Sequence, residues 1–283
     1  MTTQNLIDKS QKDSTPEEFQ EILEYVRELR GVDFNAYRGS TIKRRFDLRL
    51  SSTRMHDYAS YQKFIKENPA EIDALIDSIL INISHFFRNP FVFEALREIV
   101  LPELFDAFKD DILRIWCAGC ARGEEAYSVA ILANEIVKKE TPGTKIFIIG
   151  TDIDRKALED GKKAMYKADS VLEVKKDYLD KYFIVKDGFY HLKDEIRSLV
   201  TFAYHDITTR TTPREGIFSD YHLILCRNVV IYFNRELSAG VFNSFTKFIK
   251  QNGYLVLGEA ENISQTNRDY EEILQRAKIF RKR

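Results

Sequence analysis

Cysteine, glycine and acidic residues lie close together in the stretch RIWCAGCARGEEAYSVAI, from Arg114 to Ile131. Cys117 and Cys120 form a CxxC pair, a spacing found in redox and metal sites. A redox pair lies at a helix N-terminus, whereas Cys117 ends an apolar run and two acids follow that would oppose thiolate formation. Zinc needs about two further ligands, and neither Cys226 nor the five histidines supply a second pair. We therefore expect the CxxC to be incidental.

The glycines of the same stretch indicate a cofactor turn. Gly119 and Gly123 flank a short turn after the apolar run, and glycine lets a backbone adopt positive φ and approach a ligand closely. An ordinary tight turn would use glycine as well. The spacing is neither GxGxxG nor GK[ST], which disfavours a nicotinamide site and a P-loop.

An acid at the end of the next apolar run strengthens the cofactor interpretation. KIFIIGTDID places Asp152 and Asp154 after a strand-like segment. An acid at the carboxyl end of a second strand can accept hydrogen bonds from ribose hydroxyls, and one of the two aspartates is also expected to cap the following helix. A glycine turn and a strand-end acid together fit a nucleoside cofactor such as S-adenosylmethionine.

These residues need a sheet to bring them together, and the pattern after about Leu101 predicts one. Apolar runs alternate with amphipathic segments, which is typical of a mostly parallel, doubly wound α/β sheet. Asn252-Gly253 is expected to end a helix, and Asp187-Gly188 to turn a hairpin. The expected strands are LRIWCAG, KIFIIGTD, YHLILC, YLVLGEAE and KIFRKR, and the expected helices are EEAYSVAILANEIVKK and LSAGVFNSFTKFIKQ.

The first part of the chain has helical periodicity throughout and predicts a small all-α domain. One stripe, closed by Gly31, consists of Phe19, Ile22, Leu23, Val26 and Leu29. Ser40 is expected to cap a second helix, which carries Ile42, Phe46 and Leu50 at four-residue spacing. The segments YASYQKFIKEN and EIDALIDSILINI continue this periodicity.

Composition sets limits on function. The 283 residues include 44% hydrophobic and 31% charged residues, with a formal net charge of −1. This charge balance argues against a general polyanion binder. A signal pattern and an apolar run long enough for a membrane span are both absent from the sequence, and three cysteines do not suggest a disulfide framework. We expect a cytoplasmic protein without direct membrane insertion.

Five motifs together resemble the CheR family of chemotaxis receptor methyltransferases. They are INISHFFRNPFVFEAL, RIWCAGCARGEEAYSVAI, GTDIDRKAL, LILCRNVVIYFN and GYLVLGEAENI, in the order and spacing of the family over about residues 16–280. The resemblance implies a Rossmann-like, S-adenosylmethionine-dependent α/β methyltransferase domain with a small antiparallel β-subdomain, preceded by an all-α domain. The expected boundaries are a flexible tail at 1–15, the helical domain at 16–84, a linker at 85–100 and the methyltransferase domain at 101–283, with its β-subdomain at about 178–202.

The resemblance also implies roles for individual residues. Arg88 and Tyr232 are expected to act at the transferring methyl, and S-adenosyl-L-homocysteine would be the product. The expected cofactor-binding residues are Asn82, Ser84, Arg88, Gly119, Glu125, Asp152, Asp206, Ile207, Arg227 and Asn228. A metal ion is not expected.

The sequence departs from the family pattern at several places. Ala126 stands where proline usually follows GEE, GEAE replaces GHSE, SHFFR replaces TxFFR, and Asp206-Ile207 replaces Asn-Leu. Glu259 of GEAE adds a charge near the expected substrate entrance. The hairpin at Asp187-Gly188 is shorter than in members that dock a receptor pentapeptide, so we do not expect such a tether.

A basic stretch, YRGSTIKRRFDLRLSSTR, has six basic residues and one acid between Tyr37 and Arg54. On a helix Arg45 and Arg49 share a face. A solvated face is the ordinary explanation of such a run, but the acidic helices of chemoreceptors favour docking. The expected receptor-binding residues are Lys43, Arg44, Arg45 and Arg49. Nucleic acid is a weaker alternative because no NPPY-like motif follows the LILC strand.

The expected activity is transfer of a methyl group from S-adenosylmethionine to glutamate carboxylates on the cytoplasmic domain of methyl-accepting chemoreceptors, by a monomeric enzyme. Two alternatives remain open. One is methylation of a small-molecule acceptor with the same cofactor. The other is a non-catalytic, cofactor-binding regulator of a signalling complex.

Overall fold

The computed structural model describes residues 17–35, 37–80, 83–108, 111–216, 220–263 and 268–283. The chain divides into two compact units, residues 1–80 and 81–283. The tail expected at residues 1–15 and the predicted cofactor residue Asn82 lie outside the described residues.

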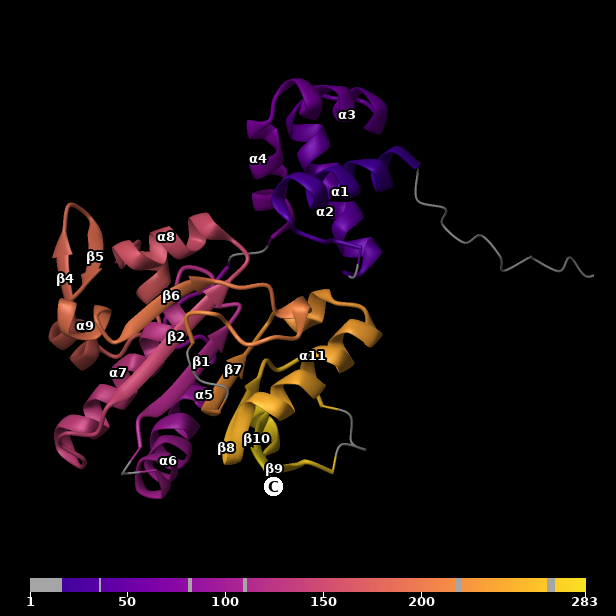
Figure 1. Ribbon diagram of the computed structural model, residues 1–283. Helices are drawn as coiled ribbons and strands as arrows, with labels where there is room; N and C mark the ends of the chain where they lie inside the picture. The colour runs from indigo at the N-terminus through magenta and orange to yellow at the C-terminus, as the bar shows by residue number, and fades with distance from the viewer. Residues whose placement is uncertain (1–16, 36, 81–82, 109–110, 217–219, 264–267) are drawn as a thin grey trace, which may run out of the picture. The chain divides into compact units, whose positions relative to one another are not determined.

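The first unit is helical within its described residues, as its periodicity predicts (Figure 1). Its helices are α1 (Glu17–Arg30), α2 (Gly39–Ser52), α3 (Tyr58–Glu67) and α4 (Ala70–Ile79). Phe46 of α2 lies at the centre of an aromatic cluster, with ring centroids 5.0 Å from Phe19 and 5.3 Å from Tyr61. These three side chains are almost completely buried, so burial of aromatic surface holds α1, α2 and α3 together.

A buried polar contact also joins α2 to α4. The Arg49 guanidinium donates to both carboxylate oxygens of Glu71 at 2.7 and 2.6 Å, and the Tyr61 hydroxyl donates to Glu71 at 2.8 Å. Burial and the Glu71 carboxylate raise the pKa of the Tyr61 phenol above its usual range. Because a buried carboxylate that loses its partners is costly, Arg49 has a structural role within this unit.

Two predictions for the first unit are wrong in detail. Leu29, expected in the buried stripe of α1, is 46% exposed. It lies in the last turn, after Val26, which is the last buried residue of α1. Ser40 does not cap α2, because the helix already begins at Gly39 and Arg38 is its N-cap. Gly31 does follow α1 with φ 72°, the left-handed conformation that ends helices.

The second unit is built on a seven-stranded sheet in the order β6-β2-β1-β7-β8-β10-β9. The first five strands of this order pair in parallel, and β10 pairs antiparallel with β8 and β9. This confirms the predicted Rossmann-like α/β fold. The bounds are β1 (Leu113–Ala118), β2 (Ile146–Asp152), β6 (Val200–Tyr204), β7 (Tyr221–Cys226), β8 (Ile249–Leu257), β9 (Tyr270–Leu274) and β10 (Ile279–Lys282).

Both faces of this sheet are covered, which explains why β1 and β7 are buried at every position (Figure 1). Ile115 and Cys117 of β1 belong to the core formed with α7 (Glu124–Lys139). Trp116 points to the other face, where its ring lies 5.4 Å from Phe245 of α11 (Arg235–Phe248). Helix α8 (Arg155–Lys163) packs on β2 and β6.

The segment expected as a linker, residues 85–100, is largely helical. It contains α5 (Pro90–Ala95) and the π-helical turn η1 (Leu96–Val100), which continue into α6 (Leu101–Ala107). Phe86, Phe93 and Leu96 are buried in the same core as α7. These residues therefore belong structurally to the α/β unit.

A second, three-stranded antiparallel sheet has the order β3-β5-β4. Its strands are β3 (Met165–Tyr166), β4 (Phe183–Lys186) and β5 (Phe189–Leu192), so it starts before the range of about 178–202 expected from the sequence, and Val200–Tyr204 pairs with β2 instead. Asp187 and Gly188, with φ of 52° and 77°, form the predicted hairpin turn between β4 and β5. The remaining helical segments are η2 (Ala168–Val171), α9 (Lys176–Tyr182), α10 (Asp194–Arg197), η3 (Ile207–Thr209), η4 (Val230–Tyr232) and η5 (Gln275–Ala277).

Asn252-Gly253, predicted as the end of a helix, lies within a strand. Helix α11 ends at Phe248 and β8 begins at the next residue. Asn252 has the positive φ of 62° expected of a cap residue, but it marks an irregularity early in β8. There β7 and β8 shift register between Tyr221 and Leu223. The residue pair predicted from the sequence to end a helix therefore forms a strand irregularity.

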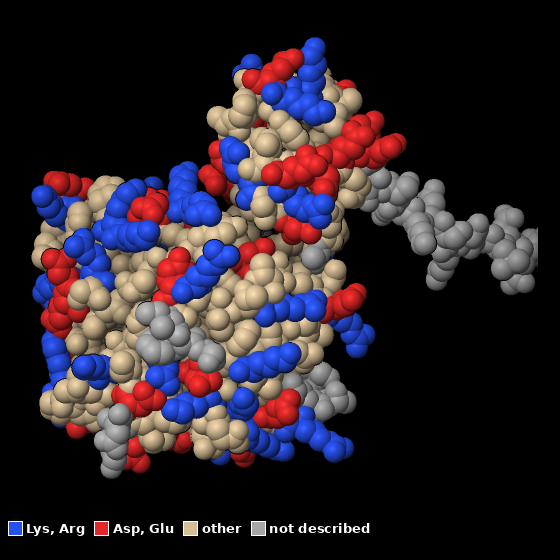
Figure 2. Space-filling view, viewed as in Figure 1, with Lys and Arg blue, Asp and Glu red and all other residues tan. Residues whose placement is uncertain are grey.

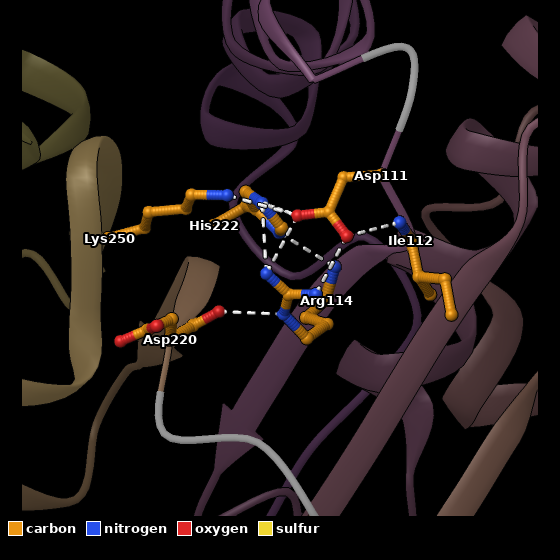
Figure 3. A network of polar contacts seen from close by, with 6 residues as sticks. All are labelled: Asp111, Ile112, Arg114, Asp220, His222 and Lys250. Carbon is orange, nitrogen blue, oxygen red and sulfur yellow. Dashed lines mark hydrogen bonds and ion pairs between the residues drawn. The ribbon is translucent and has the colours of Figure 1, made fainter.

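The starting edge of the parallel strands carries a buried polar network (Figure 3). Arg114 of β1 donates two hydrogen bonds of 2.9 Å to the Asp111 carboxylate and one of 2.8 Å to the Asp220 carbonyl. Lys250 of β8 reaches the same carboxylate at 3.0 Å. These charged hydrogen bonds hold the pKa of Asp111 well below its usual range, and they link the beginnings of β1, β7 and β8.

His222 is the neutral member of this network. Its ring is fully buried and lies with its centroid 4.3 Å from that of Phe108. Nδ1 accepts from the Arg114 backbone N–H at 3.0 Å, which leaves the ring proton on Nε2, 3.5 Å from Asp111. Burial, together with the nearby Arg114 and Lys250 charges, lowers the pKa of His222 to about 4.

Charge is distributed over the visible surface, and the helices are short or polar. Basic and acidic side chains are interspersed on the visible face of each unit (Figure 2). None of the helices in the described part of the chain is both long and apolar enough to cross a bilayer.

The depressed pKa of His222 predicts acid-sensitive stability. Its pKa falls from 6.5 unfolded to about 4 folded, so the unfolded state binds the proton more readily. The contribution of His222 to the free energy of unfolding should be fully present above pH 6.5. Stability should then fall by about 3 kcal/mol as the pH decreases from 6.5 to 4. Urea unfolding followed by the fluorescence of Trp116, the single tryptophan, measures this. His222→Asn should flatten the slope, and the exposed-residue control His56→Asn should keep it. An unchanged slope in His222→Asn would exclude His222 as its source.

Candidate functional site

The glycine turn after β1 is shaped by packing within the protein. Gly119 and Gly123 have φ of 73° and 83°, and the N–H groups of Gly119 and Cys120 both donate to the Thr151 carbonyl of β2 at 2.7 and 2.9 Å. A Cβ at Gly119 would overlap the Val229 side chain in the loop after β7. The missing side chain at Gly119 therefore lets the loop after β1 and the loop after β7 approach each other.

The three cysteines show no redox or metal geometry. Cys117, Cys120 and Cys226 are free and buried, and burial raises the pKa of each thiol well above its ordinary value. Such thiols are poor nucleophiles. Within the described ranges, His, Cys, Asp and Glu side chains form no group of three that could hold a metal ion.

Asp152 ends β2 beside the glycine turn. Its carboxylate accepts from the backbone N–H of Ala121 at 2.8 Å and of Asp154 at 2.9 Å. Burial raises the pKa of Asp152 to about 6, against the pull of these hydrogen bonds. Asp154 caps α8 through the Ala157 N–H at 2.9 Å, as predicted for one of the two aspartates.

Glu125 and Arg227 form a buried ion pair. Arg227 Nη1 lies 3.0 Å from Glu125 Oε2, and the two side chains are 3% and 13% exposed. Arg227 Nη2 donates to the Arg88 carbonyl at 2.9 Å. Burial raises the pKa of Glu125, and Arg227 opposes this rise. The pair thus joins the start of α7, the end of β7 and the turn before α5.

The turn that carries Arg88 has a strained backbone. Phe87 and Asn89 both have positive φ, 55° and 66°, which is uncommon outside glycine and typical of functional turns. Arg88 Nη1 donates to the Ile83 carbonyl at 2.9 Å, and the Phe87 N–H donates to the Ser128 hydroxyl of α7 at 2.9 Å. Contacts on both sides therefore hold Arg88 in place.

The remaining predicted residues follow neighbouring strands. Asp206 follows β6 and caps η3 through the Thr208 N–H at 2.8 Å, and Ile207 is buried. Asn228 follows β7 with φ 61°, and Tyr232 lies half-buried in η4. Ser84 is half-buried in the segment before Arg88.

The structure thus brings one subset of the predicted residues into direct contact. This subset is Glu125, Arg227 and Arg88. Gly119, Asp152, Asp206, Ile207, Asn228 and Tyr232 lie in loops at the carboxyl ends of parallel strands, which meet at one edge of the sheet. The four predicted receptor-binding residues belong to the helical unit.

Two acidic residues were missed by the sequence reasoning. Glu261 is 4% exposed and its carboxylate accepts hydrogen bonds from the loop after β7. The spacing of Gly258 and Glu261 directly after a buried strand was the available signal. Glu124 is fully buried. Its carboxylate has no hydrogen-bond partner among the described residues, only Arg122 Nε at 3.6 Å. The local sequence pattern gave no reason to distinguish the role of Glu124 from that of the adjacent Glu125.

Both units of the chain match models of one protein family. Residues 82–279 match the CheR methyltransferase SAM binding domain, and residues 17–80 match the CheR methyltransferase all-alpha domain. The chemotaxis protein methyltransferase of Borreliella burgdorferi is 27% identical, over 92% of this chain and 93% of that protein.

Two further relatives have similar identity to this chain but differ in how much of their own length it covers. The chemotaxis protein methyltransferase of Listeria innocua is 30% identical, over 82% of this chain and 85% of that protein. A 104.1 kDa protein of Rhodobacter capsulatus is 28% identical over 88% of this chain, which spans only 26% of that protein. The chain belongs to the CheR methyltransferase family and is an S-adenosylmethionine-dependent methyltransferase of that type.

Proposed function

We propose that the protein methylates glutamate side-chain carboxylates on the cytoplasmic helices of chemoreceptors. The observation that carries the proposal is the match to both CheR domains along one chain, with relatives named chemotaxis protein methyltransferases. The residues of the site are proposed on the same basis. The cytoplasm, where such receptor domains lie, is the proposed location, and the protein is proposed to act as a monomer without a pentapeptide tether.

The polar groups at the strand ends fit S-adenosylmethionine. Asp152 can accept from ribose hydroxyls, Glu125 offers a carboxylate to the methionine ammonium, and Asp206 with Ile207 follows β6 where the adenine is proposed to lie. Arg227 Nε is a buried donor without a hydrogen-bond partner among the described residues, as expected of a site that a polar ligand completes. Gly119, Ser84, Asn82 and Asn228 are assigned to the same site.

Methyl transfer to a carboxylate needs no general base from the protein. A glutamate carboxylate has a reference pKa of about 4.3 and is already anionic at neutral pH. The bound cofactor supplies an electrophilic methyl group on a sulfonium. The protein must orient the acceptor oxygen and exclude water. Arg88, in the turn before α5, and Tyr232, in η4, are the residues proposed to do this.

The docking surface is proposed to lie on α2. Contacts within the helical unit reduce the number of its basic side chains that are available to a partner. Arg49 is bound to Glu71, Lys43 pairs with Asp47 at 2.8 Å, and Arg45 is half-buried. Arg44 is exposed beside Leu48, which is 60% exposed although apolar. Both lie on an open surface of α2 that also contains Lys43 and its partner Asp47. A basic and apolar surface fits an acidic amphipathic helix.

The raised pKa of Asp152 predicts pH-dependent cofactor binding. Ribose hydroxyls donate to the ionised carboxylate, so binding should weaken as pH falls below about 6 and lose about tenfold in affinity by pH 5. Calorimetric titration with S-adenosylhomocysteine from pH 7.5 to 5 measures this. Asp152→Asn should flatten the dependence, whereas Asp160→Asn on the exposed side of α8 should retain it. A dependence that persists in Asp152→Asn would assign it to another group.

Charge reversal tests the α2 surface. Arg44→Glu should raise the KM for receptor by roughly three- to tenfold, and this effect should shrink with added salt because exposed charges are screened beyond about 8–10 Å. Steady-state methylation of chemoreceptor-bearing membranes measures it. The matched control is Lys66→Glu, an exposed basic residue of α3. Equal effects of the two variants would contradict docking on α2.

The product itself distinguishes the proposed reaction from its alternatives. Protein incubated with methyl-labelled cofactor and chemoreceptor-bearing membranes should place label on the receptor, and mild alkali should release it as methanol, because esters hydrolyse and N-methyl groups do not. Tyr232→Phe and Arg88→Ala should each lower the rate by roughly tenfold or more and change cofactor affinity less.

Other outcomes of the same assay would replace the proposal. Base-stable label on the receptor would reject the ester. Label confined to small molecules would favour a small-molecule acceptor. A protein that binds the cofactor and labels nothing would be better explained as a non-catalytic regulator.

A further inference from the structure

Two loops meet where β7 and β8 end. These strands pair in parallel, with Cys226 opposite Leu257, so the loop from Arg227 to Ile231 lies beside the turn from Gly258 to Glu261. The close fit of the two loops is visible at Gly258, where a Cβ would lie 2.8 Å from the Asn228 nitrogen. A side chain from one loop can therefore determine the backbone of the other.

The Glu261 carboxylate occupies this position and accepts five backbone hydrogen bonds. Oε1 accepts from the N–H groups of Val229, Val230 and Ile231 at 2.9, 2.8 and 3.3 Å. Oε2 accepts from Asn228 at 3.0 Å and from Gly258 at 2.7 Å. Four consecutive N–H groups that converge on one anion form a nest, and here the anion is a side chain of the same protein.

The backbone of this nest adjoins or carries the residues assigned to methyl transfer. Asn228 has a left-handed φ of 61°, which costs free energy unless surrounding contacts enforce it. Arg227 directly precedes it and forms the ion pair with Glu125. Tyr232 ends the short helix η4, whose first N–H groups bind Glu261. The carboxylate is thus the common partner of the loop that presents all three side chains.

We infer that Glu261 is the positioning residue of the transfer site: its carboxylate holds the Asn228–Ile231 backbone in the geometry that presents Arg227, Asn228 and Tyr232. The inference rests on the proposed function, because that function assigns these three residues to cofactor and acceptor. Glu261 itself acts through the loop. A neutral side chain cannot replace it fully, since glutamine offers one acceptor oxygen where the nest uses two.

Glu261→Gln tests this role with three measurements. The amide oxygen can keep the three bonds of Oε1, but the amide NH2 then faces the N–H groups of Asn228 and Gly258. Hydrogen exchange should therefore accelerate at Asn228 and Gly258 more than at Val229 and Val230, with β7 and β8 unchanged. S-adenosylhomocysteine affinity should fall roughly tenfold, and receptor methylation should lose roughly tenfold or more in kcat, because small misplacements at a reacting site are costly.

The matched control is Glu272→Gln, an exposed glutamate on β9 of the same unit, which should leave all three measurements within twofold. Glu261→Gln with wild-type exchange in the loop and unchanged affinity would overturn the inference. So would acceleration spread evenly over β7 and β8, which would mean a general loss of stability.

The unmodified protein gives a further test should the variant fail to fold. Amides of Asn228, Val229 and Val230 should exchange as slowly as those of β7, and fast exchange there would overturn the inference. Exchange and cofactor affinity need no acceptor, so they remain informative even if alkali-labile receptor methylation is absent and the proposed function fails.

Discussion

The buried ion pair between Arg227 and Glu125 is the contact on which the geometry of the site depends. Removing two charges from water is costly, and their attraction compensates only when geometry is good and further hydrogen bonds satisfy the remaining donors. Arg227 meets this requirement by also donating to the Arg88 carbonyl. The guanidinium therefore fixes α7, the loop after β7 and the turn before α5 relative to one another. Segments about 40 to 140 residues apart in sequence meet at one side chain.

A second carboxylate binds the same loop. Glu125 binds the side chain of Arg227, and Glu261 binds the backbone just after it. The loop is consequently held by two carboxylates, and Gly119 lets Val229 approach the glycine turn closely. Such double attachment suits the orienting role proposed for this site, because the geometry of the loop is then established before an acceptor arrives.

The sequence predicted the parts of this molecule that follow from local periodicity. Apolar runs alternating with amphipathic segments identified the α/β sheet, and Asp187-Gly188 identified the hairpin. Pairings between distant residues had no local signal: Arg49 with Glu71 joins two helices, and Glu261 reaches back about thirty residues to its loop. Asn252-Gly253 carried the correct backbone conformation but the wrong element, because left-handed residues serve strand irregularities as well as helix ends. For the proposed site, the motifs pointed to particular loops, and the contacts that join these loops had no signal in the sequence.

The network of Arg114, Asp111 and His222 lies at the starting edge of the same strands whose finishing edge carries the site. Arg114 and Cys117 are three residues apart on β1, and His222 and Arg227 are five apart around β7, so each pair runs from near the start of its strand to its end. The stabilising network and the proposed site therefore lie at opposite ends of a few short strands. If the proposed site is correct, substitutions that change acid stability can accumulate at one end without altering the loops that would choose the acceptor.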